Sequence, residues 1–325
     1  MKQLLCTLGL LISISLSAQQ TWPGRLTVAQ DGSGDYKTIQ EAVNAVRDHS
    51  QVQVVIFIKK GVYYEKLVIP SWKTKITLQG ESRDSSIITN SDYSGKPYPG
   101  GRDATGRDKY STFTSYTVLV QGNDFRAENL TIQNTAGRVG QAVALHAEGD
   151  RCVIVNCNLL GNQDTLYVGV DTSRQYYLNC FIEGTTDFIF GPATVVFRDC
   201  TIKSLSNSYI TAASTTPKQT YGFVFFNCKL VADTAAKKVF LGRPWRPYAR
   251  TVFINTEMGN HIVAAGWDNW RNPENEKTAF YAEYNSKGVN TSGRVPWSKQ
   301  LTKKEANQYT LKNIFGNWQP EPASH

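Results

Sequence analysis

Two short segments of the chain carry aspartates at matching places. Residues 161–167 and residues 184–190 share one order of residue types: glycine, two polar residues, aspartate, a variable residue, an aliphatic residue and an aromatic residue. If these segments are consecutive turns of a stacked repeat, Asp164 and Asp187 lie about one strand spacing apart, roughly 4.8 Å. Carboxylates at that distance repel, so one should hold its proton while the other stays ionised. Such a pair suits an acid and a nucleophile; turn formation and cation binding are the alternatives.

Amide and aromatic side chains accompany the two aspartates. Gln163 and Gln141 supply amide donors, and Tyr167 and Phe190 supply aromatic walls. Acyl transfer requires donors aimed at a developing oxyanion, and each such donor is worth roughly 10²- to 10³-fold in rate. A glutamine taken alone is usually a surface residue, so the amides gain meaning only beside the acids.

An arginine and a tryptophan occur in residues 241–245, fixed between glycine and proline. Arg243 could hold a carboxylate ionised and oriented through a bidentate pair, and the Trp245 indole could stack on a sugar ring. A structural ion pair and a core aromatic are the alternative interpretation. The repeat spacing places Arg243 about two turns beyond Asp187, so register alone does not bring the two together.

A ladder of similar segments indicates that the aspartates are stacked. An asparagine or aspartate followed by a short strand-like stretch recurs at intervals of 20 to 28 residues, at Asn129, Asn156, Asn179, Asp199, Asn227 and Asn255. A loose period of this length is typical of a solenoid, in which each turn buries its apolar face against the next. Asp164 and Asp187 each lie seven residues after a cysteine of this ladder. By the same count Asn207 and Ala235 occupy the next two turns, without charge.

The cysteines support the same interpretation. Five remain beyond the first twenty residues, an odd number that makes a poor disulfide framework: Cys152, Cys157, Cys180, Cys200 and Cys228. The last four directly follow a ladder residue, which predicts an interior column of small buried side chains. The ladder asparagines should hydrogen-bond to one another at a bend.

Short segments rich in Val, Ile, Phe and Thr lie between the ladder residues and are expected to form strands. They are residues 52–58, 75–78, 117–120, 153–155, 194–197, 223–226 and 251–254. A turn of this length holds about three such strands, which predicts a single-domain all-β protein, a parallel β-helix. Capping boxes predict an N-terminal capping helix over residues 38–48 and a C-terminal helix after Thr302 that packs back along the coils. Residues 91–111 are expected to form a long polar loop.

The two ends of the sequence and its charge bear on location and partners. Residues 1–18 have the order of a cleaved secretory signal peptide, which leaves residues 19–325 as one domain and predicts a secreted or periplasmic protein. Its apolar run is too short to span a bilayer. In an exported protein the net charge of +8 favours an acidic polymer such as an anionic polysaccharide over nucleic acid. Solubility alone would also explain that charge.

Five ordered motifs resemble those of the pectin methylesterase (pectinesterase) family: residues 61–65, 141–145, 163–166, 187–191 and 241–245. The resemblance runs from about residue 27 to residue 318. It implies a right-handed parallel β-helix that hydrolyses methyl esters of galacturonate units in pectin, as a monomer, without a metal or another cofactor. It also implies that Asp187 is the nucleophile and that Asp164 is the general acid and then the base.

The same resemblance assigns the remaining candidate residues. Gln141 and Gln163 would be the oxyanion donors, and Arg243 would orient Asp187. The side chains expected to line the sugar subsites are Thr112, Tyr167, Phe190 and Trp245. Two alternatives stay open at this point: a β-helical pectate lyase or polygalacturonase, which would need a calcium site or a differently spaced carboxylate set, and a non-catalytic polysaccharide-binding β-helix.

Overall fold

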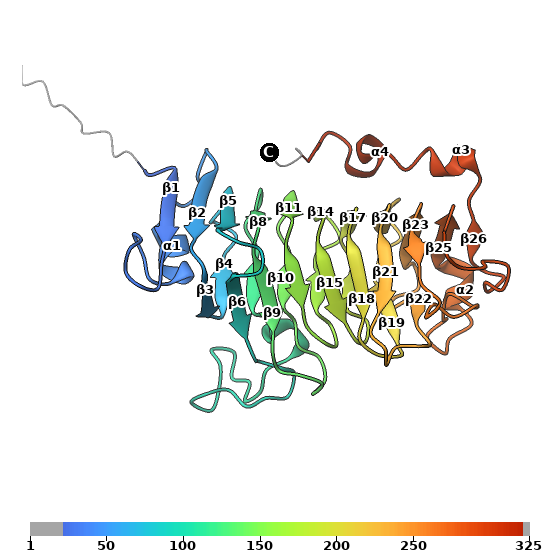
Figure 1. Cartoon of the computed structure of the whole chain (residues 1–325), viewed down its shortest axis with the longest axis horizontal. Coiled ribbons are helices and arrows are strands. Elements are labelled where there is room, and N and C mark those ends of the chain that lie inside the picture. The colour runs from blue at the N-terminus through green and yellow to red at the C-terminus, as the bar shows by residue number, and fades with distance from the viewer. Residues whose placement is uncertain (1–21, 321–325) are drawn as a thin grey trace, which may run out of the picture.

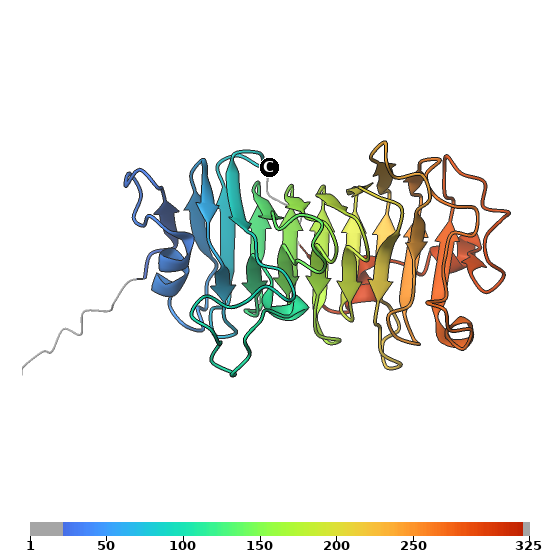
Figure 2. The same ribbon diagram turned by 90° about the horizontal axis from the view of Figure 1, so that it is seen from below.

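The computed structural model describes residues 22–320 and contains three parallel sheets that wind around one apolar interior (Figures 1 and 2). The predicted signal peptide, residues 1–18, lies outside the described residues. The central turns, from β2 (Val54–Ile58) to β22 (Phe240–Gly242), each contribute one strand to each sheet, and equivalent strands of successive turns pair in parallel. The predicted all-β parallel β-helix is therefore confirmed.

Sheet A has eleven strands in the described part of the chain: β1 (Arg25–Val28), β2 (Val54–Ile58), β5 (Ile76–Gly80), β8 (Arg126–Glu128), β11 (Cys152–Val155), β14 (Arg174–Leu178), β17 (Thr194–Arg198), β20 (Phe223–Phe226), β23 (Arg250–Ile254), β25 (Phe280–Tyr284) and β26 (Lys299–Gln300). The eight described strands of sheet B are β3 (Gly61–Tyr64), β6 (Ser86–Asn90), β9 (Thr131–Asn134), β12 (Asn158–Leu160), β15 (Phe181–Gly184), β18 (Thr201–Ser204), β21 (Lys229–Ala232) and β24 (Glu257–Met258). The seven of sheet C are β4 (Leu67–Ile69), β7 (Val118–Val120), β10 (Leu145–Ala147), β13 (Leu166–Val168), β16 (Ile189–Gly191), β19 (Tyr209–Ala213) and β22 (Phe240–Gly242).

The interior is built from columns of like side chains, because parallel strands in register place equivalent residues one above another. Phe197, Phe225 and Phe253 stack with ring centroids 4.5 Å and 4.3 Å apart and nearly parallel planes. The five cysteines in residues 22–320 are free and buried, as predicted for the four that follow a ladder residue. Burial raises the pKa of the Cys157 thiol well above its usual range, so these thiols serve as packing groups.

The ladder residues form the bend between sheets A and B. Asn129, Asn156, Asn179, Asp199, Asn227 and Asn255 all have left-handed backbone angles, with φ between 50° and 54°. Asparagine and aspartate tolerate this conformation better than most residues. The Asn156 amide donates to the Asn129 side chain at 2.6 Å, and the Asn179 amide donates to the Asn156 side chain at 3.2 Å. The Asn255 side-chain amide donates to the Asn227 side chain at 3.4 Å, so the predicted hydrogen bonds between ladder asparagines are present on either side of Asp199.

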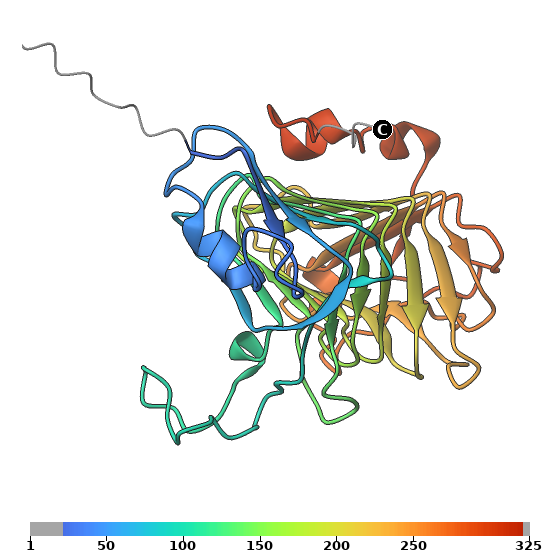
Figure 3. The ribbon, with the colours of Figure 1, turned by 60° about the vertical axis from the view of Figure 1, so that its left-hand side comes forward.

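Both predicted end structures are present. Helix α1 (Ile39–Ala45) lies at the N-terminal end of the coil (Figure 3) and begins with the predicted capping box, in which the Thr38 hydroxyl accepts from the Glu41 amide. It is shorter than the predicted 38–48, because Val46 already has extended backbone angles. Helices α3 (Lys303–Ala306) and α4 (Leu311–Phe315) run back along the outer face of sheet A (Figure 1), where Ile314 and Phe315 join its apolar cluster.

The remaining helical elements are η1 (Thr112–Thr114) and α2 (Asn275–Thr278). Residues 91–111 form the predicted long loop between β6 and β7, which projects from the body of the coil (Figures 1 and 3). Among the described residues, no helix is long and apolar enough to cross a membrane.

Candidate active site

The register of sheet C stacks the two aspartates. Leu166 pairs with Ile189, so Asp164 and Asp187, each two residues earlier, occupy the same place in successive turns. The Asp164 amide donates to the Thr186 carbonyl at 3.1 Å, which continues the ladder to the acids. Both aspartates have left-handed angles, with φ of 66° and 51°, and both side chains are buried. The repeat count therefore predicted this pairing correctly.

The same count was wrong for the next two turns. Ile189 pairs with Thr211, so the residue stacked on Asp187 is Tyr209 rather than Asn207. The Asp187 amide accordingly donates to the Tyr209 carbonyl at 2.8 Å, and Tyr209 pairs in turn with Phe240 rather than Ala235. The connections before β19 and β22 are longer, so the stacked position lies more than seven residues after the ladder cysteine in these turns. Neither replacement carries a charge, so the acid pair still stands alone in its column.

Arg243 reaches Asp187 across two strands. Its Nε donates to Asp187 Oδ1 at 3.0 Å, and its Nη2 donates to Oδ2 at 2.7 Å, which makes a bidentate ion pair. The guanidinium lies between two aromatic rings, 4.0 Å from the centroid of Tyr209 and 3.8 Å from that of Trp270. Aromatic faces on both sides fix the guanidinium plane while its edge meets the carboxylate.

The two carboxyls consequently differ in charge state. Burial, and then the neighbouring charge of Asp187, raise the pKa of Asp164 to about 8. Burial also raises the pKa of Asp187, but the hydrogen bonds and charge of Arg243 pull that pKa back. Asp164 receives no side-chain hydrogen bond from the described residues, so the shared proton resides on Asp164 and Asp187 is the anion.

The two glutamines are also neighbours. Gln141 and Gln163 form an isolated parallel bridge, and the Ala142 amide donates to the Gln163 carbonyl at 3.1 Å. Both line the pocket that contains the acids. Both glutamines therefore border the same space as Asp187, where donors to an oxyanion would be required.

These groups open into one pocket of about 390 Å³ on the outer face of sheet C. Its lining residues are Thr112, Phe113, Gln141, Gln163, Asp164, Asp187, Phe190, Ala212, Arg243, Trp245 and Trp270. Eight of the nine predicted site residues are among them. The ninth, Tyr167, does not line the pocket but packs against two residues that do. Its ring centroid is 4.7 Å from that of Phe190 and 5.2 Å from that of Phe113.

Four residues of the site were missed at the sequence level: Phe113, Ala212, Tyr209 and Trp270. Ala212 pairs with Phe190, so a correct register would have found it. Trp270 lies three residues after Trp267, which forms an isolated parallel β-bridge with Gly242. This bridge places the segment that contains Trp270 beside Arg243. No group of three or more His, Cys, Asp or Glu side chains that could hold a metal ion is present in residues 22–320.

Substituting Arg243 with lysine is expected to lower kcat by about 10²-fold, because a lysine ammonium cannot grip both carboxylate oxygens or stack between two rings. Steady-state kinetics of ester hydrolysis by the purified variant measure this change in kcat. Arg151→Lys is the matched control, since Arg151 makes a similar bidentate pair with Asp124, through bonds of 2.6 Å and 2.8 Å, away from the pocket. Equal losses in the two variants would contradict a specific role for Arg243.

The chain is similar to known proteins in its sequence and in its fold. The family model described as "Pectinesterase" matches residues 25–317. Pectinesterase 31 of Arabidopsis thaliana is 38% identical over 299 residues, which cover 91% of this chain and 93% of the relative. A pectinesterase of Daucus carota is 39% identical over 313 residues, with 90% and 94% covered. The chain spans about half the length of other similar plant proteins, described as probable pectinesterase/pectinesterase inhibitors, for example 48% of one from Arabidopsis thaliana.

Solved structures agree with these matches. The pectin methylesterase from carrot superposes with a TM-score of 0.80 at 39% identity, covering 89% of this chain and 92% of that one. A pectin methylesterase solved in complex with a hexasaccharide gives a TM-score of 0.77 at 32% identity, covering 91% and 98%. The enzyme from Erwinia chrysanthemi gives 0.77 at 31% identity, covering 93% and 99%.

Proposed function

The chain belongs to the pectinesterase family, and on that premise we propose that it hydrolyses the C6 methyl esters of pectin to pectate and methanol through an acyl-enzyme on Asp187. It is a carboxylic ester hydrolase. The observation that carries the mechanism is the asymmetry of the acid pair: Arg243 binds Asp187 through two hydrogen bonds and leaves Asp164 without one.

In the first half of the reaction, an Asp187 oxygen attacks the ester carbonyl carbon and forms a tetrahedral oxyanion. The side-chain amides of Gln141 and Gln163 donate hydrogen bonds to that oxyanion. Collapse of the intermediate breaks the bond to the methoxy oxygen, and Asp164 gives this oxygen its proton, so methanol leaves. The product on the enzyme is a mixed anhydride between Asp187 and the galacturonate carboxyl.

In the second half, the Asp164 carboxylate takes a proton from water, and the hydroxide equivalent attacks the galacturonyl carbon. The bond to the Asp187 oxygen breaks, which restores the Asp187 carboxylate and a protonated Asp164. One ester and one water have become one acid and one methanol. Arg243 holds Asp187 oriented at both stages.

The proposed function includes a binding mode for the substrate, a location for the protein and a monomeric state. A neutral ester lies in the pocket, with Trp245, Phe190 and Thr112 against the sugar rings, and the net positive charge favours the acidic polymer around it. The signal peptide predicted over residues 1–18 would export the protein to the periplasm or beyond, and a monomer is expected.

Methanol release from highly methylated pectin, measured with EDTA present, tests the proposed function. The expected result is methanol release without shortening of the polymer and without an unsaturated product that absorbs in the ultraviolet. Chain shortening or such an absorbing product would indicate a glycosidase or a lyase instead. Binding of pectin without any reaction would indicate the non-catalytic alternative.

The pH dependence of the rate provides a further prediction. Because Asp164 must be protonated in the first half-reaction and its pKa is raised to about 8, kcat/KM should fall as pH rises above about 8. The folded fraction must be followed as well: because the pKa is raised from 3.8 to about 8, this carboxyl favours folding fully below about pH 3.8, and the contribution is lost progressively as pH rises from there through 8. Circular dichroism at each pH separates the two effects. A folded protein with a flat alkaline profile would contradict the role given to Asp164.

A further inference from the structure

One wall of the pocket comes from the long connection between β6 and β7. That connection contains the loop of residues 91–111 and then η1, and η1 contributes Thr112 and Phe113 to the pocket. Phe113 is 44% exposed, so the packing of its ring on Tyr167 covers only part of the residue and does not fix the wall alone. Other contacts must hold η1 in place.

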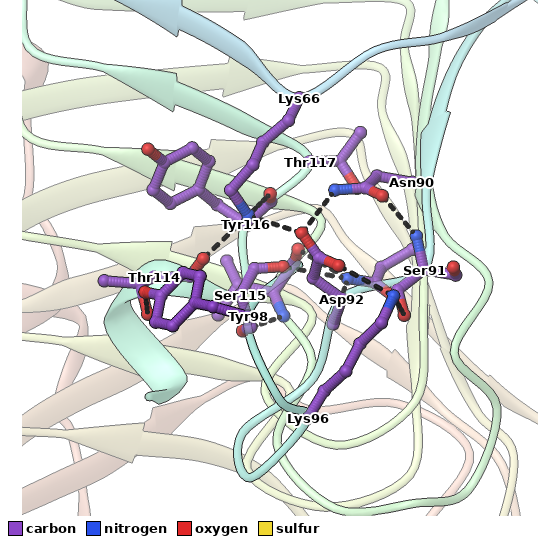
Figure 4. A network of polar contacts seen from close by, with 12 residues as sticks. Lys66, Asn90, Ser91, Asp92, Lys96, Tyr98, Thr114, Ser115, Tyr116 and Thr117 are labelled. Atoms are coloured by element: carbon purple, nitrogen blue, oxygen red, sulfur yellow. Dashed lines mark hydrogen bonds and ion pairs between the residues drawn. The ribbon is translucent and has the colours of Figure 1, made fainter. Parts of the chain in front are cut away.

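Lys66, in the turn between β3 and β4, makes those contacts (Figure 4). Its Nζ donates to the Thr114 carbonyl at 2.7 Å, to the Tyr116 carbonyl at 3.1 Å and to Asp92 Oδ2 at 2.9 Å. It also lies 4.7 Å and 4.4 Å from the ring centroids of Tyr110 and Tyr116. An ammonium has three protons, and all three are used. One side chain therefore ties together the start of the loop, its end and the last residue of η1.

Asp92 is the anionic centre of this network. Its side chain is 8% exposed and accepts hydrogen bonds from Lys66, from Lys96 at 2.8 Å and from the Asn90 amide at 3.0 Å. Burial would raise the pKa of Asp92, but the hydrogen bonds from Lys96 and Lys66 lower it, so the carboxyl is ionised. A buried carboxylate of this kind depends on its cations.

The network continues to the proposed oxyanion donor. The Ser94 amide donates to the Gln141 carbonyl at 2.8 Å. The Asn134 side-chain amide donates to the backbone carbonyls of Asp92 at 2.9 Å and Val143 at 3.1 Å. It thereby joins the start of the loop to the segment that follows Gln141. The backbone that holds Gln141 is thus bonded to the loop that Lys66 anchors.

We propose that Lys66 is a positioning residue for ester hydrolysis: it fixes the Thr112–Phe113 wall and, through the base of the loop, the backbone of Gln141. This inference rests on the proposed function, because Thr112, Phe113 and Gln141 matter only if the pocket binds the esterified sugar. Lys66 itself does not line the pocket, so it does not touch the substrate. Its effect is on how well the pocket is formed before the substrate arrives.

Lys66→Met removes the ammonium and keeps an apolar stem of similar length. With a defined methyl-esterified oligogalacturonate as substrate, kcat/KM is expected to fall by about 10- to 100-fold, mainly through a higher KM, because the wall and the loop base are no longer held. Lys66→Arg retains the charge and several donors, and it is expected to recover most of the loss.

Lys73→Met is the matched control. The Lys73 ammonium also contacts one carboxylate and two carbonyls: Asp48 at 2.8 Å, the Asn44 carbonyl at 2.9 Å and the Val46 carbonyl. These lie around the N-terminal helix, away from the pocket. This variant should lower the melting temperature as Lys66→Met does, while KM and kcat stay at wild-type values. A purely structural role for Lys66 would make the two variants behave alike, and that result would overturn the proposal.

Tyr98→Phe tests the proposal without removing a charge. The Tyr98 hydroxyl donates to the Thr114 hydroxyl at 3.0 Å, another bond between the loop and η1. This variant should fold normally and raise KM by about 2- to 5-fold with kcat unchanged. An unchanged KM would overturn the proposal even if Lys66→Met did not fold. Absence of methanol release from the wild-type protein would instead refute the proposed function.

Discussion

The Asp187→Asn variant is expected to hydrolyse methyl-esterified pectin at least roughly 10⁴-fold more slowly than the wild-type protein. The carboxamide is a far weaker nucleophile than the carboxylate, and it loses the charge that pairs with Arg243. Asparagine is the appropriate replacement because Asp187 has φ of 51°, a left-handed conformation that asparagine adopts and alanine resists. Methanol release at high enzyme concentration, with the folded state checked by circular dichroism, measures the loss.

Asp199→Asn is the matched control for this variant. Asp199 has φ of 54° and makes the same type of bend on a different edge of the coil. The substitution removes one carboxylate without approaching the pocket, so the rate should remain at the wild-type value. Activity of Asp187→Asn within about tenfold of the wild type would exclude Asp187 as the nucleophile.

The Asp164→Asn variant is expected to lose roughly 10²- to 10⁴-fold in the rate of methyl ester hydrolysis, because methoxide must then leave without a proton. Asparagine again suits the left-handed backbone, here with φ of 66°. The loss should be smaller than that of Asp187→Asn, since the nucleophile and its arginine remain. Steady-state rates with the same pectin give this comparison.

A substrate with an activated leaving group separates the two acids. A nitrophenyl ester of an oligogalacturonate needs no general acid, so Asp164→Asn should still release about one nitrophenolate per active site and then stall, because it lacks the base for the second step. Asp187→Asn should release none at that rate. If Asp164→Asn also failed to react in the first turnover, its role would be structural rather than that of an acid and base.

The sequence was sufficient to predict the part of the site that follows the repeat. Asp164 and Asp187 lie at the same distance from consecutive ladder cysteines, and parallel stacking converts equal distances along the chain into proximity. The buried cysteines and the asparagine bends followed from the same pattern. These features depend on neighbouring turns of equal length, and the turns that carry the two acids meet that condition.

Other parts of the site could not be predicted from the pattern alone. Arg243 lies two strands from Asp187 and reaches it only because its side chain is long and is held between Tyr209 and Trp270. Its role came from the family resemblance, and the ion pair is visible only in three dimensions. The stacking of Tyr209 on Asp187 was missed because the connection before β19 is longer than the repeat count assumes.

The wall formed by η1 shows a second limit. Thr112 was named through the resemblance, but nothing in the local sequence predicts that Lys66, far earlier in the chain, bonds to the carbonyls of Thr114 and Tyr116. Such contacts join a loop to a turn of the coil, and they do not recur from turn to turn, so the repeat pattern does not predict them. Their effect on the pocket follows from geometry and burial alone.

The central claim is that a covalent acyl-enzyme lies between ester and acid, and partitioning between two nucleophiles tests it most directly. Methyl and ethyl esters of one oligogalacturonate would be hydrolysed with hydroxylamine present, and the ratio of hydroxamate to acid would be measured for each. A common acyl-enzyme has lost the alcohol before the second nucleophile attacks, so the ratio should be the same for both esters. A ratio that changes with the alcohol would mean that water attacks the ester directly, and the proposed role of Asp187 as nucleophile would be wrong.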